Sequence, residues 1–416
     1  MILERRGAGA LLALIIMFSL SASFLLAFKN DGFDIGMALF GLGFAFLILI
    51  SYNLAALIFR HIDRITLVIC YFLTSIGLVT LARLNIDIAV RQLIWLALGT
   101  VVLFITVVVI KRASDFGRLN YLLMAAVLGL LISTLLFART IGGARNWVYI
   151  GQFSFQPSEI AKVMFIIVSA YFFAERRPAP AIVCYAVFTA LCVFTLVLSN
   201  DLGGALLYAG TFLVMFFAGT GRTFLTFAGL GVLSAGAFAS YHLFSHVRTR
   251  VEIWQNPWMY HRTQGYQIVQ GLMAIASGGL FGAGLGLGYP DAIPVNTSDF
   301  IFAVICEEFG IIFGIVTILA YLVFIIRGLI IALNAETRFD ALLVFGATCM
   351  LSLQSFIIIG GVIKLIPLTG ITLPFISAGG TSLVASLALV GIIEGVAVKN
   401  GERDEYEIVR AGGEVV

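Results

Sequence analysis

The chain is a succession of long apolar runs separated by short polar segments. A bilayer core takes about 20 mostly apolar residues per helix, and on that criterion the sequence predicts about twelve membrane-spanning helices. Their predicted limits are 8–27, 36–59, 65–82, 92–110, 119–137, 157–174, 180–199, 203–219, 223–243, 299–326, 341–363 and 380–398. The expected fold is therefore an all-α polytopic membrane protein with one transmembrane domain over residues 1–398.

Composition agrees with this interpretation. Of the 416 residues, 61% are hydrophobic and only 11% are charged, whereas a soluble domain has about a quarter charged residues. The first run resembles a signal peptide, but many further spans follow and no small-residue cleavage site is evident, so we expect a first transmembrane helix. A formal net charge of +3 is too small to indicate a nucleic-acid partner. The five cysteines all lie in apolar runs without metal-ligand spacing, and we expect them to be buried.

Charge asymmetry predicts the orientation, because cytoplasmic segments of membrane proteins are enriched in Lys and Arg. With the N-terminus inside, the inside segments carry most of the basic residues, and both termini are expected in the cytoplasm. The polar tail 399–416 is then a cytoplasmic tail, expected to be disordered. The basic residues left outside predict an anionic ligand there, unless the loops tolerate charge without purpose. They are Arg139, Arg145, Arg248, Arg250 and Arg262.

The longest polar interruption is the predicted extracytoplasmic loop 245–298, where a functional site is expected. It contains a glycine-rich tract at 277–290. The G-x-G spacings in this tract do not indicate a dinucleotide site, because no strand precedes them and no βαβ unit surrounds them. Glycine here predicts close backbone packing or tight turns.

Two stretches outside this loop place ionisable groups beside apolar spans. Glu159 and Lys162 are three residues apart and share one face of a predicted helix that starts at Pro157. They form either a structural ion pair or the wall of a polar cavity, and residues 146–155 before them are expected to lie along the interface as an amphipathic piece. Asp201 either caps the next helix or faces the outer side beside Arg145.

Two further stretches lie near the C-terminus. Asp299 is expected to start a helix as its cap, and the adjacent carboxylates Glu307 and Glu308 follow inside an apolar span. At least one of the two needs a partner or a watery cavity, and a proton or cation path is the alternative. Residues 365–382 contain two prolines and no helical periodicity, which predicts a broken, re-entrant segment buried in protein or lining a cavity.

Together these stretches resemble the SEDS family, which includes RodA, FtsW and SpoVE. The matching motifs are GGAR-x-W…QPSEIAK, DLG, GYQ…SGGLFG-x-G, SDFIFA…EE-x-G and LPF-x-S-x-GG-[ST]-S, over roughly residues 65–398. The resemblance implies a ten-helix membrane bundle, here with two extra N-terminal spans within residues 1–60. No catalytic triad, Walker loop or metal-ligand cluster is apparent in the sequence.

The resemblance also implies a function. Such proteins polymerise lipid II into glycan strands on the outer face of the bacterial cytoplasmic membrane, for cell shape, division or sporulation. They work with a class B penicillin-binding protein as transpeptidase, and a divalent cation is implied although the sequence shows no metal site. The residues expected to bind substrate are Arg145, Glu159, Lys162, Arg248, Arg250, Gln267, Asp299 and Ser377.

The sequence departs from the family pattern at the position of the usual loop acid, where it has Tyr260. An unperturbed tyrosine titrates near about 10 and is a poor base at neutral pH. The base is then expected at Asp201 or His261, with Asp291 as a further candidate, unless the loop alignment slips. Two other hypotheses stay open. The protein is a non-catalytic paralogue that acts as a lipid II-binding scaffold, or it is a flippase for lipid-linked precursors.

Overall fold

The computed structural model describes residues 2–28, 32–112, 119–141, 144–150, 153–175 and 177–412. In this part of the chain twelve helices are long and apolar enough to cross a membrane, as predicted. The helices are α1 Ile2–Ala27, α2 Ile35–Ile58, α3 Arg64–Leu84, α4 Ile86–Arg112, α5 Asn120–Phe137, α6 Pro157–Ala174, α7 Ala179–Leu198, α8 Leu202–Thr220, α9 Thr223–Leu243, α10 Ser245–Gln255, α11 Tyr266–Gly278, α12 Ile301–Leu333, α13 Arg338–Val362 and α14 Gly380–Arg410.

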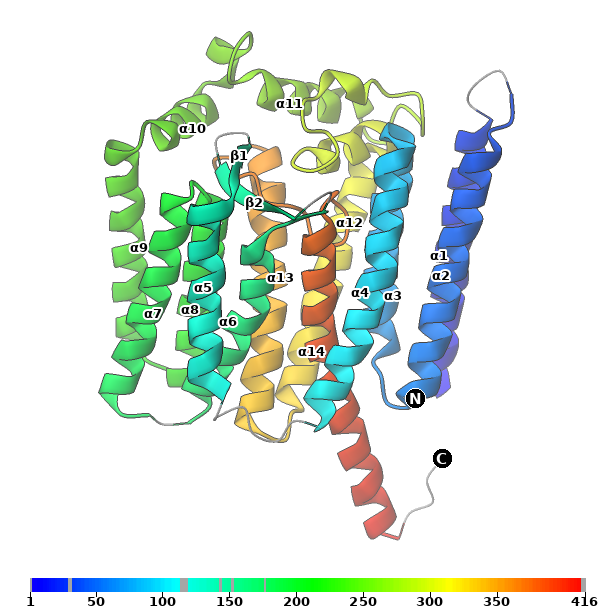
Figure 1. Ribbon diagram of the computed structural model, residues 1–416. Coiled ribbons are helices and arrows are strands. Elements are labelled where there is room, and N and C mark those ends of the chain that lie inside the picture. Colours follow the sequence, from blue (N-terminus) through cyan, green and yellow to red (C-terminus); the bar gives the residue numbers. More distant parts are fainter. Residues whose placement is uncertain are drawn as a thin grey trace.

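The spans stand side by side and run alternately up and down in one bundle (Figure 1). The first turn of α1 and the last turn of α14 lie at the same end, below in Figure 1. A small sheet, α10 and α11 lie at the opposite end. We call the end with the first turn of α1 and the last turn of α14 the terminal end, and the end with the sheet, α10 and α11 the outer end. An even number of spans places both chain ends on one side, which agrees with the predicted arrangement of the termini.

Helices α3, α13 and α14 form the interior of the bundle. In α14, 94% of the most apolar window is buried, whereas α9 at the periphery has no buried residue there. Small residues let α14 approach α4 closely: a Cβ at Gly391 would lie 2.8 Å from the carbonyl oxygen of Leu103. Close packing of this kind is a main source of helix association in a membrane, where lipid tails are as apolar as leucine.

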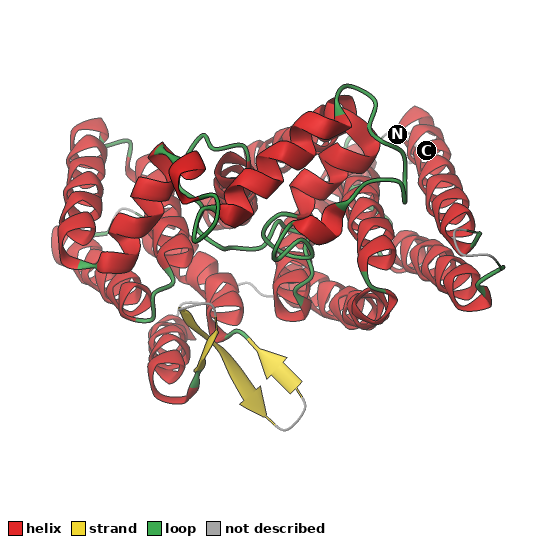
Figure 2. Ribbon diagram, turned by 90° about the horizontal axis from the view of Figure 1, so that it is seen from above, coloured by secondary structure: helices red, strands yellow, loops and turns green. Residues whose placement is uncertain are grey.

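The segment before α6 forms a three-stranded antiparallel sheet of β1 (Arg139–Ile141), β2 (Ala144–Ile150) and β3 (Phe153–Phe155). Figure 2 shows it at one side of the bundle, seen from the outer end. An amphipathic piece along the interface was the expectation for residues 146–155, and the described part of this stretch forms β2 and β3 instead. The alternation of aromatic and polar residues there is the period of two that a strand requires.

The loop 245–298 contains α10, a short 3₁₀ helix η2 (Pro257–Tyr260), α11 and a second 3₁₀ helix η3 (Pro290–Ala292). Helices α10 and α11 lie across the outer end (Figure 1). The glycine-rich tract packs on α12 as predicted, since a Cβ at Gly278 would lie 2.2 Å from the carbonyl oxygen of Cys306. Segment 363–379 contains no helix or strand, and Leu373, Phe375 and Ile376 within it are buried. The prediction of a broken segment buried in protein is confirmed.

Two expectations are wrong. The tail beyond residue 398 is not disordered, because α14 continues to Arg410 (Figure 1). Its polar groups have partners: Lys399 Nζ lies 3.0 Å from Asp340 Oδ1, and Asn400 Nδ2 donates to the Ile331 carbonyl at 3.1 Å. Of the five cysteines expected to be buried, Cys184 on α7 is exposed and Cys349 on α13 is half-buried, whereas Cys70, Cys192 and Cys306 are buried.

Candidate functional site

Asp201 lies at the outer end, where α7 ends and α8 begins. It is 6% exposed and is the N-cap of α8, with Oδ1 accepting from the backbone N–H of Gly204 at 2.8 Å. An Asp at this position satisfies an amide that has no partner within the helix. The next residue but one, Gly203, lies against the broken segment: a Cβ there would meet Ile371 Cγ2 at 2.4 Å. Asp201 is therefore both a helix cap and a neighbour of that segment.

Helix α10 brings Arg250 to the same segment. Arg250 Nη1 donates to the Thr369 carbonyl at 3.1 Å, and Trp254 Nε1, one turn later on α10, donates to the Lys364 carbonyl at 3.1 Å. These two hydrogen bonds fasten α10 on carbonyl groups that no helix or strand satisfies. The guanidinium of Arg250 thereby becomes part of the polar surroundings of Asp201.

Asp299 approaches from the start of α12. Its Oδ1 accepts from Ser298 Oγ at 2.8 Å, and a Cβ at Gly370 would lie 3.4 Å from its Oδ2. The predicted helix cap is not formed by Asp299, because Phe300 holds the N-cap position of α12. Asp201, Arg250 and Asp299 thus surround residues 369–371, and we call these three residues the outer polar cluster.

Charge and burial act against each other in this cluster. Burial raises the pKa of the Asp201 carboxyl above its ordinary value, and the negative charge of Glu159 raises it further. The pKa is lowered in part by the hydrogen bond from the Gly204 amide and by the positive charges of Arg250 and Lys162. Burial also raises the pKa of Asp299, against the hydrogen bond from Ser298 and the charge of Arg250. Burial lowers the pKa of Arg250, while Asp201 and Asp299 hold it up. Both carboxyls accordingly bind a proton more readily than an exposed aspartate does.

Glu159 and Lys162 form an ion pair on the first turns of α6, on one face as predicted. Lys162 Nζ also donates to Gln354 Oε1 at 2.9 Å, and Gln354 Nε2 donates to the Thr372 carbonyl at 2.9 Å. The side chain of Lys162 is 2% exposed. This chain of polar groups joins α6 through α13 to the broken segment, so the pair supports the structure. Direct contact of Lys162 with substrate stays a prediction.

Ser377 is also withdrawn from solvent. It is 4% exposed, donates from Oγ to the Ser298 carbonyl at 2.7 Å and accepts from the Leu373 N–H at 2.9 Å. The next residue, Ala378, donates its N–H to the Thr297 carbonyl at 2.9 Å. Ser377 therefore joins the broken segment to the start of α12, next to Asp299. Its predicted contact with substrate is untested.

The other predicted residues lie around the cluster. Arg145 has an exposed side chain on β2, and its backbone N–H donates to the Ser199 carbonyl at 2.9 Å, two residues before Asp201. Arg248 is exposed and lies over the Tyr241 ring, with its carbon Cζ 5.8 Å from the ring centroid. Gln267 is half-buried in the first turn of α11. The two arginines are accessible cations at the outer end of the bundle.

The loop that departs from the family pattern forms a tight turn. Tyr260 ends η2 and is half-buried against the core. His261 is exposed, and its Nδ1 lies 2.7 Å from the Trp258 carbonyl oxygen within the same turn. The contacts described for His261 thus stay local, whereas the charges of Arg250 and Lys162, from two other helices, act on the carboxyl of Asp201. Asp291 is exposed in η3.

The paired glutamates of α12 have partners, as the sequence required for at least one. Glu308 Oε1 accepts from Arg83 Nε at 2.9 Å, and Glu307 Oε1 accepts from the Tyr289 N–H at 2.9 Å. Sequence reasoning missed the partners Arg83 and Gln354, because each lies nearly two hundred residues or more from the group it contacts. No local pattern marks such a pair.

No group of three or more His, Cys, Asp or Glu in the described residues is arranged to hold a metal ion. The two carboxyls of the outer polar cluster each have one oxygen engaged, Asp201 with an amide and Asp299 with a hydroxyl. The described residues thus do not preform a cage for the divalent cation that the resemblance implies.

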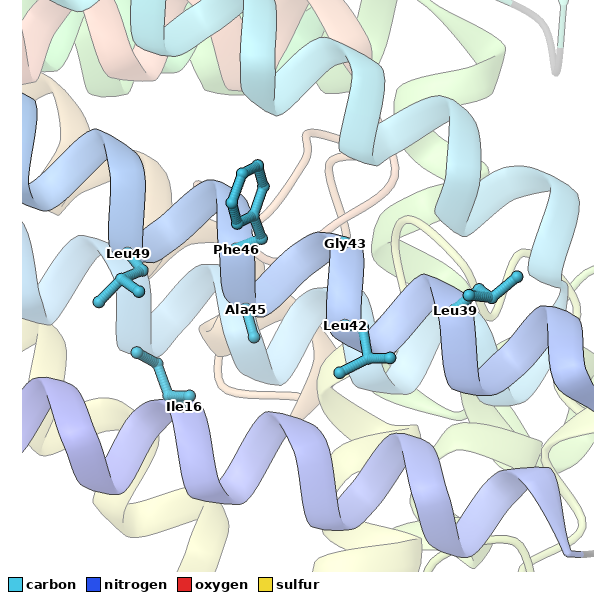
Figure 3. Close-up of a pocket in the computed structure, with 7 residues that line it drawn as sticks. All are labelled: Ile16, Leu39, Leu42, Gly43, Ala45, Phe46 and Leu49. Carbon is cyan, nitrogen blue, oxygen red and sulfur yellow. The ribbon is translucent and has the colours of Figure 1, made fainter.

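An apolar cavity of about 570 Å³ lies between α1 and α2 (Figure 3). Leu39, Leu42, Phe46 and Leu49 of α2 and Ile16 of α1 line it. Figure 3 shows Ile16 on the α1 side and Phe46 pointing away from α1. Since every lining residue is apolar or glycine, this cavity supplies no group for catalysis.

Residues 52–402 match the family model of the FtsW, RodA and SpoVE cell cycle proteins. The chain belongs to this family. The SEDS resemblance in the motifs is thereby confirmed, and the match begins within α2, so α1 and most of α2 precede it.

Relatives of this SEDS protein align over much of its length. The peptidoglycan glycosyltransferase RodA of Mycobacterium tuberculosis is 33% identical over 99% of this chain and 96% of its own. Stage V sporulation protein E of Bacillus subtilis is 34% identical over 74% of this chain and 86% of its own. Because the first alignment covers nearly all of the chain, it includes both N-terminal spans.

Solved structures share the fold. A chain of a peptidoglycan synthase complex that coordinates polymerization and crosslinking has a TM-score of 0.71 at 28% identity, over 82% of this chain and 98% of that one. The rod shape determining protein RodA of Thermus thermophilus has a TM-score of 0.61 at 27% identity, over 83% and 98%. The protein is a multi-pass bacterial membrane protein with the SEDS helical bundle.

Proposed function

We propose that this protein is a peptidoglycan glycosyltransferase that polymerises lipid II. Relatives in its family are named peptidoglycan glycosyltransferase RodA and probable peptidoglycan glycosyltransferase FtsW. The observation that carries the proposal to particular residues is that a buried carboxyl, Asp201, and the guanidinium of Arg250 both lie beside the broken segment. A glycosyl transfer from a pyrophosphate donor requires these two kinds of group, a base and a cation.

The reaction joins an acceptor sugar hydroxyl to the anomeric carbon of the donor. As the new C–O bond forms, the bond from that carbon to the pyrophosphate breaks, and the pyrophosphate leaves with the bonding electrons. The hydroxyl proton passes to the base, for which we propose the carboxylate of Asp201. A raised pKa suits this role, since a general base is most efficient when its pKa approaches the working pH. Of the two catalytic candidates, the buried surroundings favour Asp201 over exposed His261.

Arginine is suited to the leaving group, because its planar guanidinium can donate two parallel hydrogen bonds to phosphate oxygens. We assign the pyrophosphate to Arg250, with the exposed Arg145 and Arg248 reaching the same anion from β2 and α10. In this assignment Asp299 holds Arg250 in place through its opposite charge. Gln267 at the start of α11 orders the loop or the acceptor.

The active face in this proposal is extracytoplasmic. The terminal end carries most of the basic residues and the outer end carries the cluster, which is the charge distribution expected for cytoplasmic termini. A class B penicillin-binding protein is the proposed transpeptidase partner. The support is the fold shared with a chain of a complex that couples polymerization with crosslinking.

The test is polymerisation of labelled lipid II by the purified full-length protein with its co-encoded transpeptidase. The variant Asp201→Asn removes the base but keeps a residue that caps helices as well as aspartate does. We expect a loss of about 10²–10⁴-fold in rate, the usual contribution of a general base, with unchanged thermal stability. Asp87→Asn, at an exposed outer-end position, is the matched control and should retain activity.

Full activity in Asp201→Asn would refute the assignment of the base. No activity in the natural protein, with lipid II binding retained, would refute the transferase and favour the scaffold. The flippase hypothesis relied on free carboxylates within α12. Glu308 instead binds Arg83 of α3, and Glu307 binds the Tyr289 N–H of the glycine-rich tract, so the flippase is not favoured.

A further inference from the structure

A polar cavity of about 350 Å³ lies at the terminal end, opposite the outer polar cluster. The connection between α2 and α3 forms one wall, the last turns of α12 form another, and α14 forms the third. Its polar lining includes Arg60, Asp63, Arg64, Arg327, Asn334 and Asn400. We call it the terminal-end pocket. None of the roles assigned above uses it.

Most charges in and around this pocket are paired. Arg327 binds Asp63 with two hydrogen bonds, Nη2 to Oδ1 at 2.7 Å and Nε to Oδ2 at 3.0 Å. Arg60 Nη1 and His61 Nε2 lie 2.8 and 2.6 Å from the two carboxylate oxygens of Glu405. These pairs join α12 and α14 to the α2–α3 connection, so ion pairs link all three walls of the pocket.

Arg64 is the exception. It is half-buried and lines the pocket, and none of the described residues forms a hydrogen bond or ion pair with its guanidinium. The other two arginines of the lining each have a carboxylate partner, Arg60 in Glu405 and Arg327 in Asp63. The remaining lining carboxylate, Asp404, is paired with Arg403. The pocket thus offers one unmatched guanidinium to an anion.

The stability of α3 does not account for this arginine. Arg64 is the first residue of α3, and a cation in the first turn of a helix is disfavoured by the helix dipole. Asp63 already caps this end of α3, with Oδ1 accepting from the Ile65 N–H at 3.3 Å, so a bound anion would compensate the guanidinium. Phosphate is the anion whose geometry the guanidinium fork fits.

The lining also has an apolar side. Ile62, Ile65, Ile330 and Ile331 line the pocket beside the arginines. Nearby, at the last turns of α2 and α12, Leu57 and Leu333 are 80% and 85% exposed, as side chains that contact lipid tails are. A soluble phosphate would use only the guanidinium, whereas a phospholipid would use the guanidinium and the apolar wall together.

We propose that the terminal-end pocket binds the phosphate of an anionic glycerophospholipid. With cytoplasmic termini the lipid belongs to the cytoplasmic leaflet. The phosphodiester contacts Arg64, and the acyl chains follow the apolar ends of α2 and α12. The proposal does not depend on glycosyltransferase activity, so it can fail or succeed independently.

The experiment measures binding of short-chain phosphatidylglycerol to the purified full-length protein in a neutral detergent, by isothermal titration calorimetry. We expect saturable binding that Arg64→Gln weakens about tenfold, the equivalent of one charge-assisted hydrogen bond of about 1.4 kcal/mol. Arg222→Gln removes the same charge from the exposed α8–α9 connection, which lies at the same end of the bundle but away from the pocket (Figure 1). This control should bind as the natural protein does. Thermal unfolding without lipid checks that the variants are folded.

Two comparisons separate the sources of phosphate. Short-chain phosphatidylcholine, whose choline cancels the phosphate charge, should bind at least several-fold more weakly. Inorganic phosphate should not displace phosphatidylglycerol. Equal weakening in Arg64→Gln and Arg222→Gln would overturn the pocket as the site, because it would show attraction to overall charge. Tighter binding of inorganic phosphate than of lipid would overturn the phospholipid in favour of a soluble phosphate compound.

Discussion

Arg83 on α3 and Glu308 on α12 form an ion pair, with Nε and Oε1 2.9 Å apart and side chains 10% and 0% exposed. Arg83 Nη2 also donates to the Gly288 carbonyl at 3.2 Å, and Glu307 holds the neighbouring Tyr289 N–H. One buried pair therefore joins two helices and the glycine-rich tract that leads into the outer loop.

The first prediction concerns this pair. Replacing Arg83 with Leu leaves Glu308 buried without its partner, and we expect a loss of about 3–5 kcal/mol in the free energy of unfolding. The double variant Arg83→Leu/Glu308→Leu should recover most of that loss, since neither charge is then left buried. Chemical denaturation in detergent measures both. A double variant no more stable than Arg83→Leu would contradict the pairing energetics.

The glycine-rich tract allows a second prediction. Gly282 has φ of +83°, and a Cβ there would lie 2.2 Å from the Glu308 carbonyl oxygen. Gly282→Ala should therefore destabilise the protein by at least about 1–3 kcal/mol. Gly231→Ala on α9, where a Cβ meets nothing within 4 Å, should instead be neutral or stabilise by about 0.5–1 kcal/mol. Equal effects in the two variants would show that the tract does not pack on α12 as described.

A third prediction follows from the protonation of Asp201. Its pKa is raised by burial, and a general base works only when ionised. Activity should thus fall as the pH drops through this raised pKa, and the acidic limb of the lipid II polymerisation rate should lie above the ordinary aspartate value of about 4. The measurement is the rate of lipid II polymerisation at saturating substrate, over about four pH units from roughly pH 4.5 to pH 8.5.

Replacement of Arg250 provides the control for the pH profile of polymerisation. Arg250 lowers the pKa of Asp201, so Arg250→Gln should move the acidic limb to still higher pH in addition to weakening lipid II binding. An acidic limb that does not move in Arg250→Gln, or one that persists in a residual activity of Asp201→Asn, would assign the titration to another group.

The fourth prediction addresses Tyr260, which stands where the family has an acid. If Asp201 is the base, the natural protein polymerises lipid II, and Tyr260→Asp changes the rate by less than about tenfold, or 1.4 kcal/mol in the barrier. The same labelled lipid II assay measures it. A silent natural protein that gains activity in Tyr260→Asp would instead identify a disabled transferase on an intact frame.

Much of the fold could be predicted from the sequence. The twelve spans, the helix start at Pro157, the Glu159–Lys162 pair and the broken segment all depend on local composition and spacing. The tail was misjudged because its polar composition is that of a disordered segment. Its helix is held by Lys399, Asn400 and Glu405, whose partners come from α13, α12 and the α2–α3 connection.

The sequence by itself determined the membrane-spanning architecture and the membership of this protein in its family, because hydrophobic length and short motifs are read within a few dozen residues. Only the tertiary structure decided which polar residues come together: Arg250 near the charges of Asp201 and Asp299, Lys162 with Gln354, and Arg83 with Glu308. The physical reason is that a buried charge inside a membrane protein needs a partner, and the helix that supplies it is chosen by the packing of the whole bundle. Hydrophobic periodicity along the chain therefore does not predict these pairs.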